Sequence, residues 1–325
     1  MFQELVHAKA FQNYLEKVDF PQKPQHLYDP IRYILSLSGK RIRPLLVLMG
    51  AELFDDSAIK QALPASAAIE FFHNFSLIHD DIMDVAPLRR GKPTVHQKWN
   101  DNVAILSGDA LLIKAYQELS KCPTDKISAL LRLFNATSLE VCEGQQYDMD
   151  FEERAQVSEI AYIDMIRLKT SVLLGCALQM GAIVAGADER SQALLYDFGV
   201  NLGIAFQLQD DILDVYGNPQ SFGKQVGGDI LSNKKTILFV KLQELVSPAD
   251  QEELTYLLRQ TIDTEPNKVE KMMDLYAKYD IRTLAIYQKE KFTTIAYEKL
   301  IEIQVETDKK QALFSLADAL MHRVR

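Results

Sequence analysis

The stretch FHNFSLIHDDIMD, residues 72–84, decides the fold, because its apolar residues recur at helical spacing until it ends in aspartates. Asp80, Asp81 and Asp84 stand at positions i, i+1 and i+4. Side chains at i and i+4 share one helix face with Cβ atoms about 5–6 Å apart, so the two carboxylates repel each other unless a cation lies between them. Divalent cations that prefer oxygen ligands are the natural candidates. The stretch therefore predicts a helix that carries a metal site.

The same arrangement occurs a second time, in IAFQLQDDILD at residues 204–214. Turn-forming residues follow both copies, so both groups of aspartates are expected near helix C-termini. The helix dipole disfavours anions there by about 0.3–1 kcal/mol each. Because the same unfavourable arrangement of aspartates occurs twice, we favour a functional role for them over that of a solvated acidic helix end.

Cationic segments follow both motifs. LRRGKPT at residues 88–94 follows the first, and GKQVGGD at 223–229 with NKK at 233–235 follows the second. A third basic segment, GKRIRP at 39–44, ends in a proline that can occupy the first turn of a helix. Mg²⁺ usually takes one or two protein carboxylates with phosphate oxygens and water, while Arg and Lys bind phosphate directly. Together these segments predict an enzyme that handles a polyphosphorylated substrate between two helices.

The composition excludes several classes of protein. The chain has 325 residues, 47% hydrophobic and 25% charged, which is typical of a soluble globular protein. Its formal net charge of −9 provides no overall positive field for a nucleic-acid partner. No apolar run reaches the roughly 18 residues needed to cross a membrane. The three cysteines form no CxxC pair and predict reduced thiols in a cytoplasmic protein.

Helical periodicity runs through nearly the whole chain, and alternation typical of strands is almost absent. Breaks are predicted where proline and glycine occur, at residues 21–30, 64, 87–93, 123, 217–228 and 248. No linker is rich enough in Gly, Ser or Pro to separate two halves. The chain is therefore predicted to be one all-helical domain, residues 1–325, with its two aspartate motifs on helices that face each other across a cavity.

In their order and spacing these motifs resemble those of the trans-isoprenyl diphosphate synthases, the polyprenyl synthetase family. The matching segments are residues 39–44, 80–84, 88–94, Lys169-Thr170, 206–209, 210–214 and 223–235. They span most of residues 38 to 236. The resemblance implies an all-α fold, an antiparallel helical bundle around a deep central cavity (the isoprenoid synthase fold), within one prenyl synthase domain. It also implies a head-to-tail prenyltransferase that condenses isopentenyl diphosphate with an allylic diphosphate.

The resemblance assigns roles position by position. The implied metal ligands are Asp80, Asp81, Asp84, Asp210 and Asp214, holding about three Mg²⁺ ions for which Mn²⁺ can substitute. The implied catalytic residues are Asp80, Asp84, Asp210, Lys169, Thr170 and Gln207. Isopentenyl diphosphate is expected to meet Gly39, Lys40, Arg43, His73 and Arg90. The allylic diphosphate is expected to meet Arg89, Lys169, Lys224 and Lys234. His79 and His96 match no such role and are predicted to be packed histidines.

Product length depends on residues before the first motif. Ser76 and Phe75, four and five positions before Asp80, lie about one turn deeper along the predicted helix, and Phe72 lies nearly one turn further. In the family, an aromatic residue only at the fifth position, without an insertion in the motif, accompanies short products up to C20. Geranylgeranyl diphosphate is therefore favoured over farnesyl diphosphate, although Phe72 and Phe75 can also simply pack the core.

Several alternatives remain open: a farnesyl diphosphate or longer-chain synthase, a class I terpene cyclase or head-to-head synthase, and a non-catalytic regulatory subunit. A cyclase needs no second diphosphate site, so the segment at residues 39–44 argues against it. Regulatory subunits tend to lose an acidic motif, and both are present here. The resemblance further implies a homodimer, and the partners expected are the two diphosphate substrates, with no nucleic acid and no membrane span.

Overall fold

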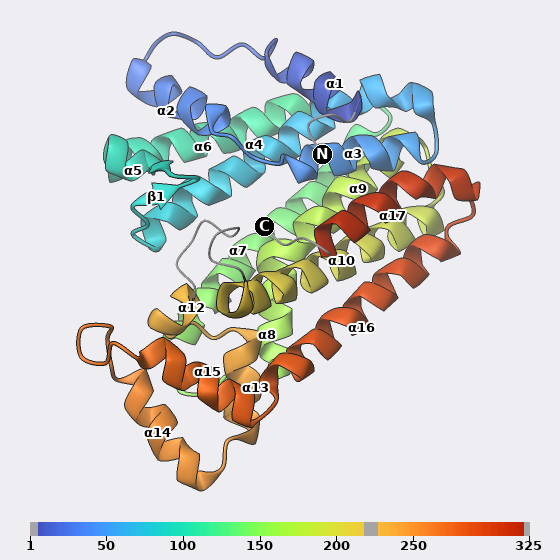
Figure 1. The fold of residues 1–325 in the computed structure, drawn as a ribbon. Helices are drawn as coiled ribbons and strands as arrows, with labels where there is room; N and C mark the ends of the chain where they lie inside the picture. Colours follow the sequence, from blue (N-terminus) through green and yellow to red (C-terminus); the bar gives the residue numbers. More distant parts are fainter. Residues whose placement is uncertain (1–5, 218–226, 322–325) are drawn as a thin grey trace. The chain divides into compact units, whose positions relative to one another are not determined.

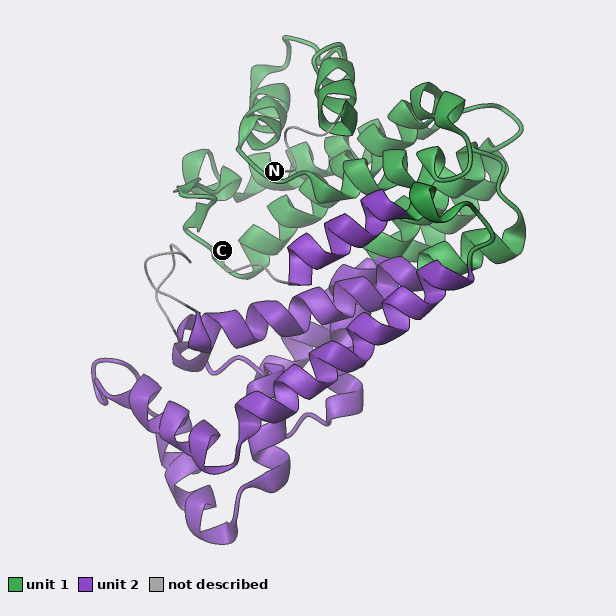
Figure 2. Ribbon diagram, turned by 45° about the vertical axis from the view of Figure 1, so that its right-hand side comes forward, with its two compact units in different colours: residues 1–138, 173–196, 303–310 green, residues 139–172, 197–302, 311–325 purple. Residues whose placement is uncertain are grey.

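The computed structural model describes residues 6–217 and 227–321, and nearly all of its elements are helices (Figure 1). The predicted all-α class is thereby confirmed. The chain forms two compact units, residues 1–138, 173–196 and 303–310 in unit 1 and residues 139–172, 197–302 and 311–325 in unit 2 (Figure 2). Because each unit combines three segments, no single cut of the chain separates them. The single domain inferred from the sequence stays a prediction.

Unit 1 contains most of the N-terminal half of the chain. Its elements are α1 (Val6–Leu15), α2 (Gln25–Ser36), α3 (Ile42–Glu52), η2 (Asp56–Ala58), α4 (Ile59–Met83), β1 (Leu88–Arg89), β2 (Lys92–Pro93), α5 (Val95–Lys98), α6 (Asp101–Leu119) and α9 (Val172–Val184). Unit 2 contains α8 (Glu159–Ile166), η3 (Arg167–Ser171), α12 (Gly228–Leu231), α13 (Ile237–Leu245), α14 (Pro248–Leu258), α15 (Lys268–Lys278) and α16 (Ile281–Glu302). Both units receive residues from α7 (Ile127–Glu153), α10 (Glu189–Tyr216) and α17 (Thr307–Met321).

Helix α4 is the central element of unit 1 and packs against α3 and α6. After its exposed first turn the helix is buried on most sides, and Ala62, Ala65, Ala67, Ala68 and Ile69 are fully buried. A helical segment that is mostly apolar all round is stable only inside a core. The first aspartate motif, at the other end of this helix, is therefore held by a rigid and well-packed element.

Helices α3 and α9 approach each other closely through glycines. A Cβ atom on Gly50 would lie 2.4 Å from the carbonyl oxygen of Leu178, and one on Gly181 would lie 2.0 Å from that of Val47. Neither distance is compatible with a side chain, so this packing requires glycine at both positions.

The predicted break at Pro64 is wrong, because α4 runs through it from Ile59. Pro64 has no N–H to bond the carbonyl of Lys60, but Lys60 is exposed within the first turn, where water can bond that carbonyl. Pro30 likewise lies inside α2. Pro248 does mark a helix start, at the first position of α14.

One helical stretch, Glu159–Val184, is long and apolar enough to cross a membrane, but 78% of its most apolar window is buried within the protein. Such burial is what the core helices of soluble proteins show. The stretch is also not one regular helix, because the π-helical turn η3 interrupts it.

Candidate active site

The first aspartate motif lies at the C-terminal end of α4, as predicted. The helix ends at Met83, and Asp84 is its C-cap, whose N–H donates to the carbonyl of Asp80 at 2.9 Å. Asp84 is exposed and Asp80 is half-buried, whereas Asp81 is only 1% exposed. The three carboxylates therefore occupy different environments on one helix end.

Asp81 is bound by Arg89. The Arg89 Nε donates to both carboxylate oxygens at 2.9 and 2.8 Å, and its terminal nitrogen donates to Oδ1 at 2.7 Å. Such bidentate Arg–carboxylate pairs fix geometry as well as charge. The same guanidinium is 3.7 Å from Asp80. Asp81 thus orients Arg89 beside the motif, an arrangement that the sequence did not predict.

The two arginines after the motif lie on a β-hairpin. Leu88 pairs with Pro93 and Arg89 with Lys92, which leaves Arg90 and Gly91 as a two-residue loop. Both loop residues have positive φ, 53° and 73°, as a type I′ turn requires. The hairpin separates the two arginines, because Arg89 reaches α4 while Arg90 reaches the loop after α2. Sequence reasoning missed the hairpin, since two-residue strands leave no periodicity.

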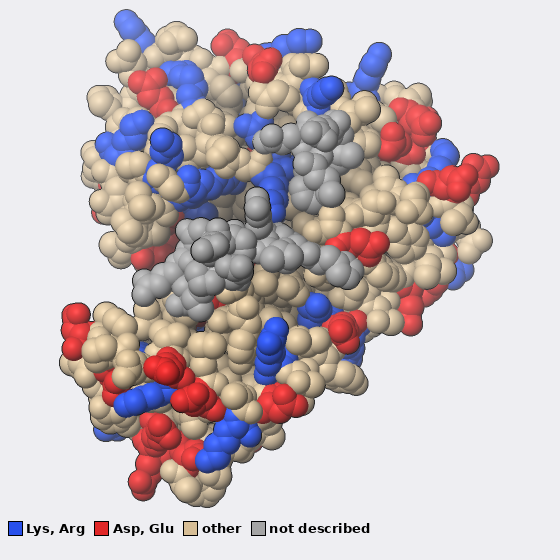
Figure 3. All heavy atoms as spheres, viewed as in Figure 1, with Lys and Arg blue, Asp and Glu red and all other residues tan. Residues whose placement is uncertain are grey.

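Arg90 meets the basic segment at residues 39–44. Its guanidinium donates to the carbonyl of Leu37 at 3.3 Å and lies where a side chain on Gly39 would be, 2.8 Å from the ideal Cβ position. A side chain at residue 39 would displace this guanidinium, so glycine permits the observed approach. Lys40 and Arg41 line an adjacent cavity of about 400 Å³ together with residues of α1. Figure 3 shows Lys and Arg side chains gathered on this face, near β1 and α3.

Arg43 and His73 form the inner part of this basic cluster. A guanidinium nitrogen of Arg43 lies 3.1 Å from His73 Nε2. Because Arg43 can only donate, His73 accepts at Nε2 and carries its proton on Nδ1. Desolvation, Arg43, Arg90 and Arg89 hold the pKa of His73 well below its usual value, so its imidazole is neutral at physiological pH. Desolvation also lowers the pKa of Arg43 to about 10, at which it remains charged in neutral solution.

Glu70 supplies the negative charge of this cluster. It is only 3% exposed, and burial raises its pKa although Arg41, Arg90 and Arg43 oppose that rise. A buried carboxylate among arginines reduces their mutual repulsion while leaving a net positive site. The result is a positively charged cluster at the residues predicted to bind isopentenyl diphosphate.

Unit 2 brings most of the remaining predicted residues together in one cavity of about 290 Å³. Its lining includes Lys169, Thr170, Gln207, Asp210, Asp214 and Lys234, all predicted from the sequence. Asp148 and Tyr162 also line it and were not predicted, and so do Asp211 and Asp229, which lie in the predicted motif segments but were given no role of their own. In a cavity lined by both kinds of side chain, carboxylates can bind metal ions while lysines bind phosphate oxygens.

Lys169 and Thr170 lie in the π-helical turn η3. A Cβ atom on Gly144 would lie 2.2 Å from the backbone nitrogen of Lys169, and one on Gly203 would lie 2.7 Å from Ser171 Cα. Glycines on α7 and α10 therefore let both helices touch this turn. Such π-helical turns occur frequently at functional sites.

Lys169 is held by Asp148, with 2.6 Å between Nζ and Oδ2. Both side chains are partly exposed, at 23% and 19%. Asp148 belongs to the segment EGQQYD (residues 143–148), whose glycine inside a helical pattern was the one signal that could have drawn attention to it.

The second motif lies at the C-terminal end of α10, also as predicted. Its middle aspartate, Asp211, is 5% exposed and accepts hydrogen bonds from the Tyr162 hydroxyl and, at 3.0 Å, from the Ile237 N–H. Desolvation raises the pKa of Asp211 to about 7. Asp214 accepts from the Asp229 N–H at 3.0 Å, which ties the motif to α12. As in the first motif, the middle carboxylate is turned into the protein.

Within residues 6–217 and 227–321, no group of three or more His, Cys, Asp or Glu side chains is assembled as a metal cage. Mg²⁺ does not require one, because it commonly binds one or two carboxylates and fills its octahedron with phosphate oxygens and water. Asp210 and Asp214 share a cavity with Lys169 and Lys234, so the donor set fits a metal that arrives with a diphosphate.

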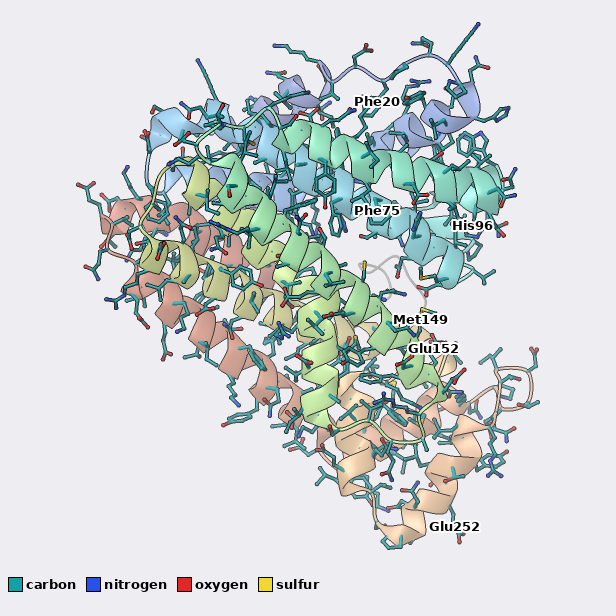
Figure 4. The ribbon with its side chains drawn as sticks, turned by 180° about the vertical axis from the view of Figure 1, so that it is seen from behind. Phe20, Phe75, His96, Met149, Glu152 and Glu252 are labelled. Carbon is teal, nitrogen blue, oxygen red and sulfur yellow. The ribbon has the colours of Figure 1, made fainter. Side chains whose placement is uncertain are left out.

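The other predicted residues have mixed placements. Phe72 is 1% exposed and packs against Phe75 and Phe134, with ring centroids 5.6 and 5.3 Å away. Phe75 on α4 is half-buried (Figure 4), and the Ser76 hydroxyl donates to the carbonyl of His73 at 2.9 Å. Lys224 lies outside the described residues.

His79 and His96, which were predicted to be packed histidines, both lie against other residues of unit 1. His79 Nε2 lies 3.2 Å from the carbonyl of Ile105 and fills the space beside Gly108, where a side chain would clash with the ring. His96 is 8% exposed on α5.

A nearly all-helical fold with two aspartate motifs, each accompanied by Lys and Arg side chains, is typical of enzymes that act on diphosphates. Residues 24–278 match the family model described as polyprenyl synthetase. A geranylgeranyl diphosphate synthase of Sulfolobus acidocaldarius is 38% identical over 91% of this chain and 91% of its own. A geranylfarnesyl diphosphate synthase of Natronomonas pharaonis is 39% identical over 67% of this chain and 69% of its own.

Solved structures agree with this class. The crystal structure of a geranylgeranyl pyrophosphate synthase superposes with a TM-score of 0.91 at 46% identity, covering 97% of this chain and 98% of that one. A polyprenyl synthase of Caulobacter crescentus, complexed with calcium and isoprenyl diphosphate, has a TM-score of 0.83 at 26% identity over 100% and 97%. The chain therefore belongs to the polyprenyl synthetase family, which confirms the resemblance and makes it an enzyme, a trans-prenyltransferase.

Proposed function

We propose that the protein condenses isopentenyl diphosphate with an allylic diphosphate and releases geranylgeranyl diphosphate. The observation that carries this proposal is the cavity of unit 2, which collects Lys169, Thr170, Gln207, Asp210 and Lys234 from elements far apart in sequence. The alternative product is a shorter or longer prenyl diphosphate. Relatives named for geranylgeranyl and for geranylfarnesyl products have nearly equal identity, so their names do not decide the length.

Isopentenyl diphosphate is assigned to the basic cluster of unit 1. Arg90 places its guanidinium against Gly39, and Arg43 places its own beside His73. Neutral His73 accepts from Arg43 and so fixes the direction of that guanidinium. Together with Lys40, this cluster gives the nucleophilic substrate a site of its own, which a terpene cyclase does not need.

The allylic diphosphate is assigned to Lys169 and Lys234, with Arg89 and Lys224 as further contacts. Metal ligation is assigned to the first and third aspartates of each motif, and the supporting role of Asp81 stays a prediction beside its observed pairing with Arg89. Mg²⁺, when bound, neutralises charge on the departing diphosphate.

The chain's own side chains have three tasks in this reaction. The lysines stabilise the negative charge that grows on the diphosphate as its bond to carbon breaks. The Gln207 amide and the Thr170 hydroxyl present dipoles at the same cavity and can stabilise the allylic cation. Apolar residues Met165 and Ile166 on α8 help to exclude water, which would otherwise capture that cation.

Phe75 is proposed to limit the product length. It lies on α4 about one turn before Asp80 and is half-buried, whereas Phe72 is enclosed by other rings. The growing chain is therefore expected to reach Phe75 before Phe72.

Two further properties are proposed with the reaction. On α6, Ile105, Leu106 and Ile113 are 42%, 61% and 58% exposed, and a second copy of the chain is proposed to cover them. The enzyme is proposed to be cytoplasmic, which agrees with its free cysteines. Light scattering on purified protein tests the homodimer, and a monomer would contradict it.

The decisive experiment incubates purified protein with Mg²⁺, labelled isopentenyl diphosphate and, separately, dimethylallyl, geranyl and farnesyl diphosphate. Chromatography should show geranylgeranyl diphosphate as the final product from each primer. Phe75→Ala should lengthen that product by at least one isoprene unit, while Phe72→Ala, the matched control, should lower stability without the same lengthening. An unchanged product from active Phe75→Ala would place the limit elsewhere, and absence of label in any prenyl product would refute the transferase assignment.

A further inference from the structure

The feature that the proposed reaction leaves unexplained is Lys268, the first residue of α15. Its side chain is 1% exposed, although lysine is among the residues least often buried. The Nζ donates to Asn233 Oδ1 at 2.8 Å and to the carbonyl of Gln260 at 3.0 Å, both neutral oxygens. A cation at a helix N-terminus also opposes the helix dipole. Both the burial of Lys268 and its position at a helix N-terminus are unfavourable for a lysine. We therefore look for the role of Lys268 in the residues that it contacts.

Asn233 occupies a special backbone position. Its φ is 55°, in the left-handed region that asparagine tolerates better than other residues with side chains. Its N–H donates to the carbonyl of Ile230 at 3.2 Å, and the next N–H, that of Lys234, donates to the carbonyl of Asp229 at 2.9 Å. This pair of bonds is the Schellman arrangement that ends a helix, here α12. The left-handed turn at Asn233 therefore decides the direction in which Lys234 leaves α12.

The Asn233 side chain is bound on both sides. Its Oδ1 accepts from Lys268, and its Nδ2 donates to the carbonyl of Leu258 at 3.0 Å. Lys268 and Leu258 lie at the two ends of the connection from α14 to α15, so this asparagine joins that connection to α12. Helices α12 and α15 lie side by side (Figure 1). Burial lowers the pKa of Lys268, which agrees with its having neutral partners.

The other end of α12 is tied to the second aspartate motif. The Asp214 carboxylate accepts from the Asp229 N–H, and its carbonyl accepts from the Gly227 N–H at 2.8 Å. Helix α12 is thus fixed to the motif at its start and to Lys268, through Asn233, at its end. Lys234, one residue beyond, lines the same cavity as Asp210 and Asp214.

We propose that Lys268 is a positioning residue for the allylic diphosphate: it holds Asn233 in its left-handed turn and thereby directs Lys234 into the cavity of the second aspartate motif. This inference rests on the proposed role of Lys234. Lys268 lies behind Asn233 rather than among the residues that line that cavity, so it acts through another residue and has no contact with the substrate of its own.

The test measures KM for each substrate separately in Lys268→Met, which keeps most of the side chain's length and removes its charge and donors. The KM for the allylic diphosphate should rise about tenfold, less than the full loss of a charge-assisted contact can cost, while that for isopentenyl diphosphate should stay within about twofold. Lys271→Met is the matched control. Lys271 lies on the same helix, is 40% exposed and pairs with Glu265 at 2.5 Å, so its loss should change neither KM.

A double variant separates positioning from general stability. In a Lys234→Ala background, Lys268→Met should raise the allylic KM by no more than about twofold further, because the residue it directs is gone. If the effects of Lys234→Ala and Lys268→Met on the allylic KM multiply in the double variant, the lysine is purely structural and the proposal is wrong. Equal effects of Lys268→Met on the KM of both substrates would have the same meaning. If Lys268→Met does not fold, Asn233→Ala replaces it, since alanine lacks the bound side chain and adopts the left-handed turn less readily than asparagine. That variant should show the same selective loss, and its absence would overturn the proposal.

Measuring Lys234→Ala first distinguishes an error in the proposed role of Lys234 from an error in the proposed role of Lys268. Lys234→Ala alone should raise the allylic KM. If it does not, the assignment of Lys234 in the proposed function is wrong, and the positioning role falls with it. If Lys234→Ala raises the allylic KM and Lys268→Met does not, only the positioning role is wrong.

Discussion

Replacing Asp81 by asparagine should reduce stability rather than remove a metal ligand. Asp81 is 1% exposed and accepts three hydrogen bonds from Arg89, which is itself 23% exposed. Removing one member of a buried ion pair costs about 3–5 kcal/mol. Here asparagine keeps one acceptor oxygen and Arg89 can regain some water, so we expect a loss of about 2 kcal/mol.

The assay is urea unfolding at pH 7 with EDTA, so that metal binding contributes nothing. Asp80→Asn is the matched control, since Asp80 is the neighbouring carboxylate and lies 3.7 Å from the same arginine. Its unfolding free energy should change by no more than about 0.5 kcal/mol, because an ion pair at that distance is weak. Turnover should respond in the opposite order, with a loss of several orders of magnitude in Asp80→Asn and a smaller loss in Asp81→Asn.

The double variant Asp81→Asn/Arg89→Met decides whether the unpaired charge is the cause. Removing both partners should recover much of the lost stability, because no buried charge is left uncompensated. Wild-type stability in Asp81→Asn would refute the anchoring role. Loss of turnover in Asp81→Asn equal to that in Asp80→Asn, without loss of stability, would instead support the metal role that the resemblance implied.

Four other outcomes are expected. Asp80→Ala and Asp210→Ala should each lower turnover by several orders of magnitude and keep the fold, as judged by circular dichroism; near-normal activity at limiting Mg²⁺ would contradict the metal assignment. Arg43→Ala should weaken isopentenyl diphosphate selectively and Lys234→Ala the allylic substrate, each by about one to two decades, and equal effects on both substrates would rule out the two-site map. The pKa of His73 is lower in the folded than in the unfolded state, so below about pH 6.5 only the unfolded state binds a proton at this residue. The free energy of unfolding should therefore fall by up to about 1.4 kcal/mol per pH unit as the pH decreases, and His73→Gln should lack this fall. Parallel pH–stability curves for the two proteins would contradict this. Urea unfolding followed by fluorescence and by circular dichroism should give one coincident transition if the chain is a single domain, whereas separate midpoints would show two.

The sequence predicted those features that depend on local pattern. Helix α4 ends where the aspartates and the following turn signals place its end, and α10 does the same. Six of the residues that line the cavity of unit 2 could also be named in advance, because the motif order resembles a known family. Periodicity alone would have given the helices without saying which of them share a cavity.

The features that escaped prediction depend on contacts between distant residues. Tyr162 and Asp211 are 49 positions apart and Lys169 and Asp148 are 21 apart, and neither pair has a local signal. The break wrongly predicted at Pro64 shows the opposite error, because proline was read as a helix breaker although it lies near the helix start, where the carbonyl it leaves unbonded is exposed to water.

In both motifs the middle aspartate lies in a different environment from the two outer aspartates. On an α-helix the i+4 side chain lies about 40° from the i side chain, whereas the i+1 side chain lies about 100° away. Asp81 and Asp211 are accordingly turned into the protein, at 1% and 5% exposure. One holds Arg89, and the other holds Tyr162 and the start of α13. The outer aspartates lie on a common face, where the proposed metal would bind, while the middle aspartate fixes the helix end that presents them. If the proposed ligation is right, a motif that keeps only the outer pair should bind metal more weakly, because its helix end is no longer anchored, although both donors are still present.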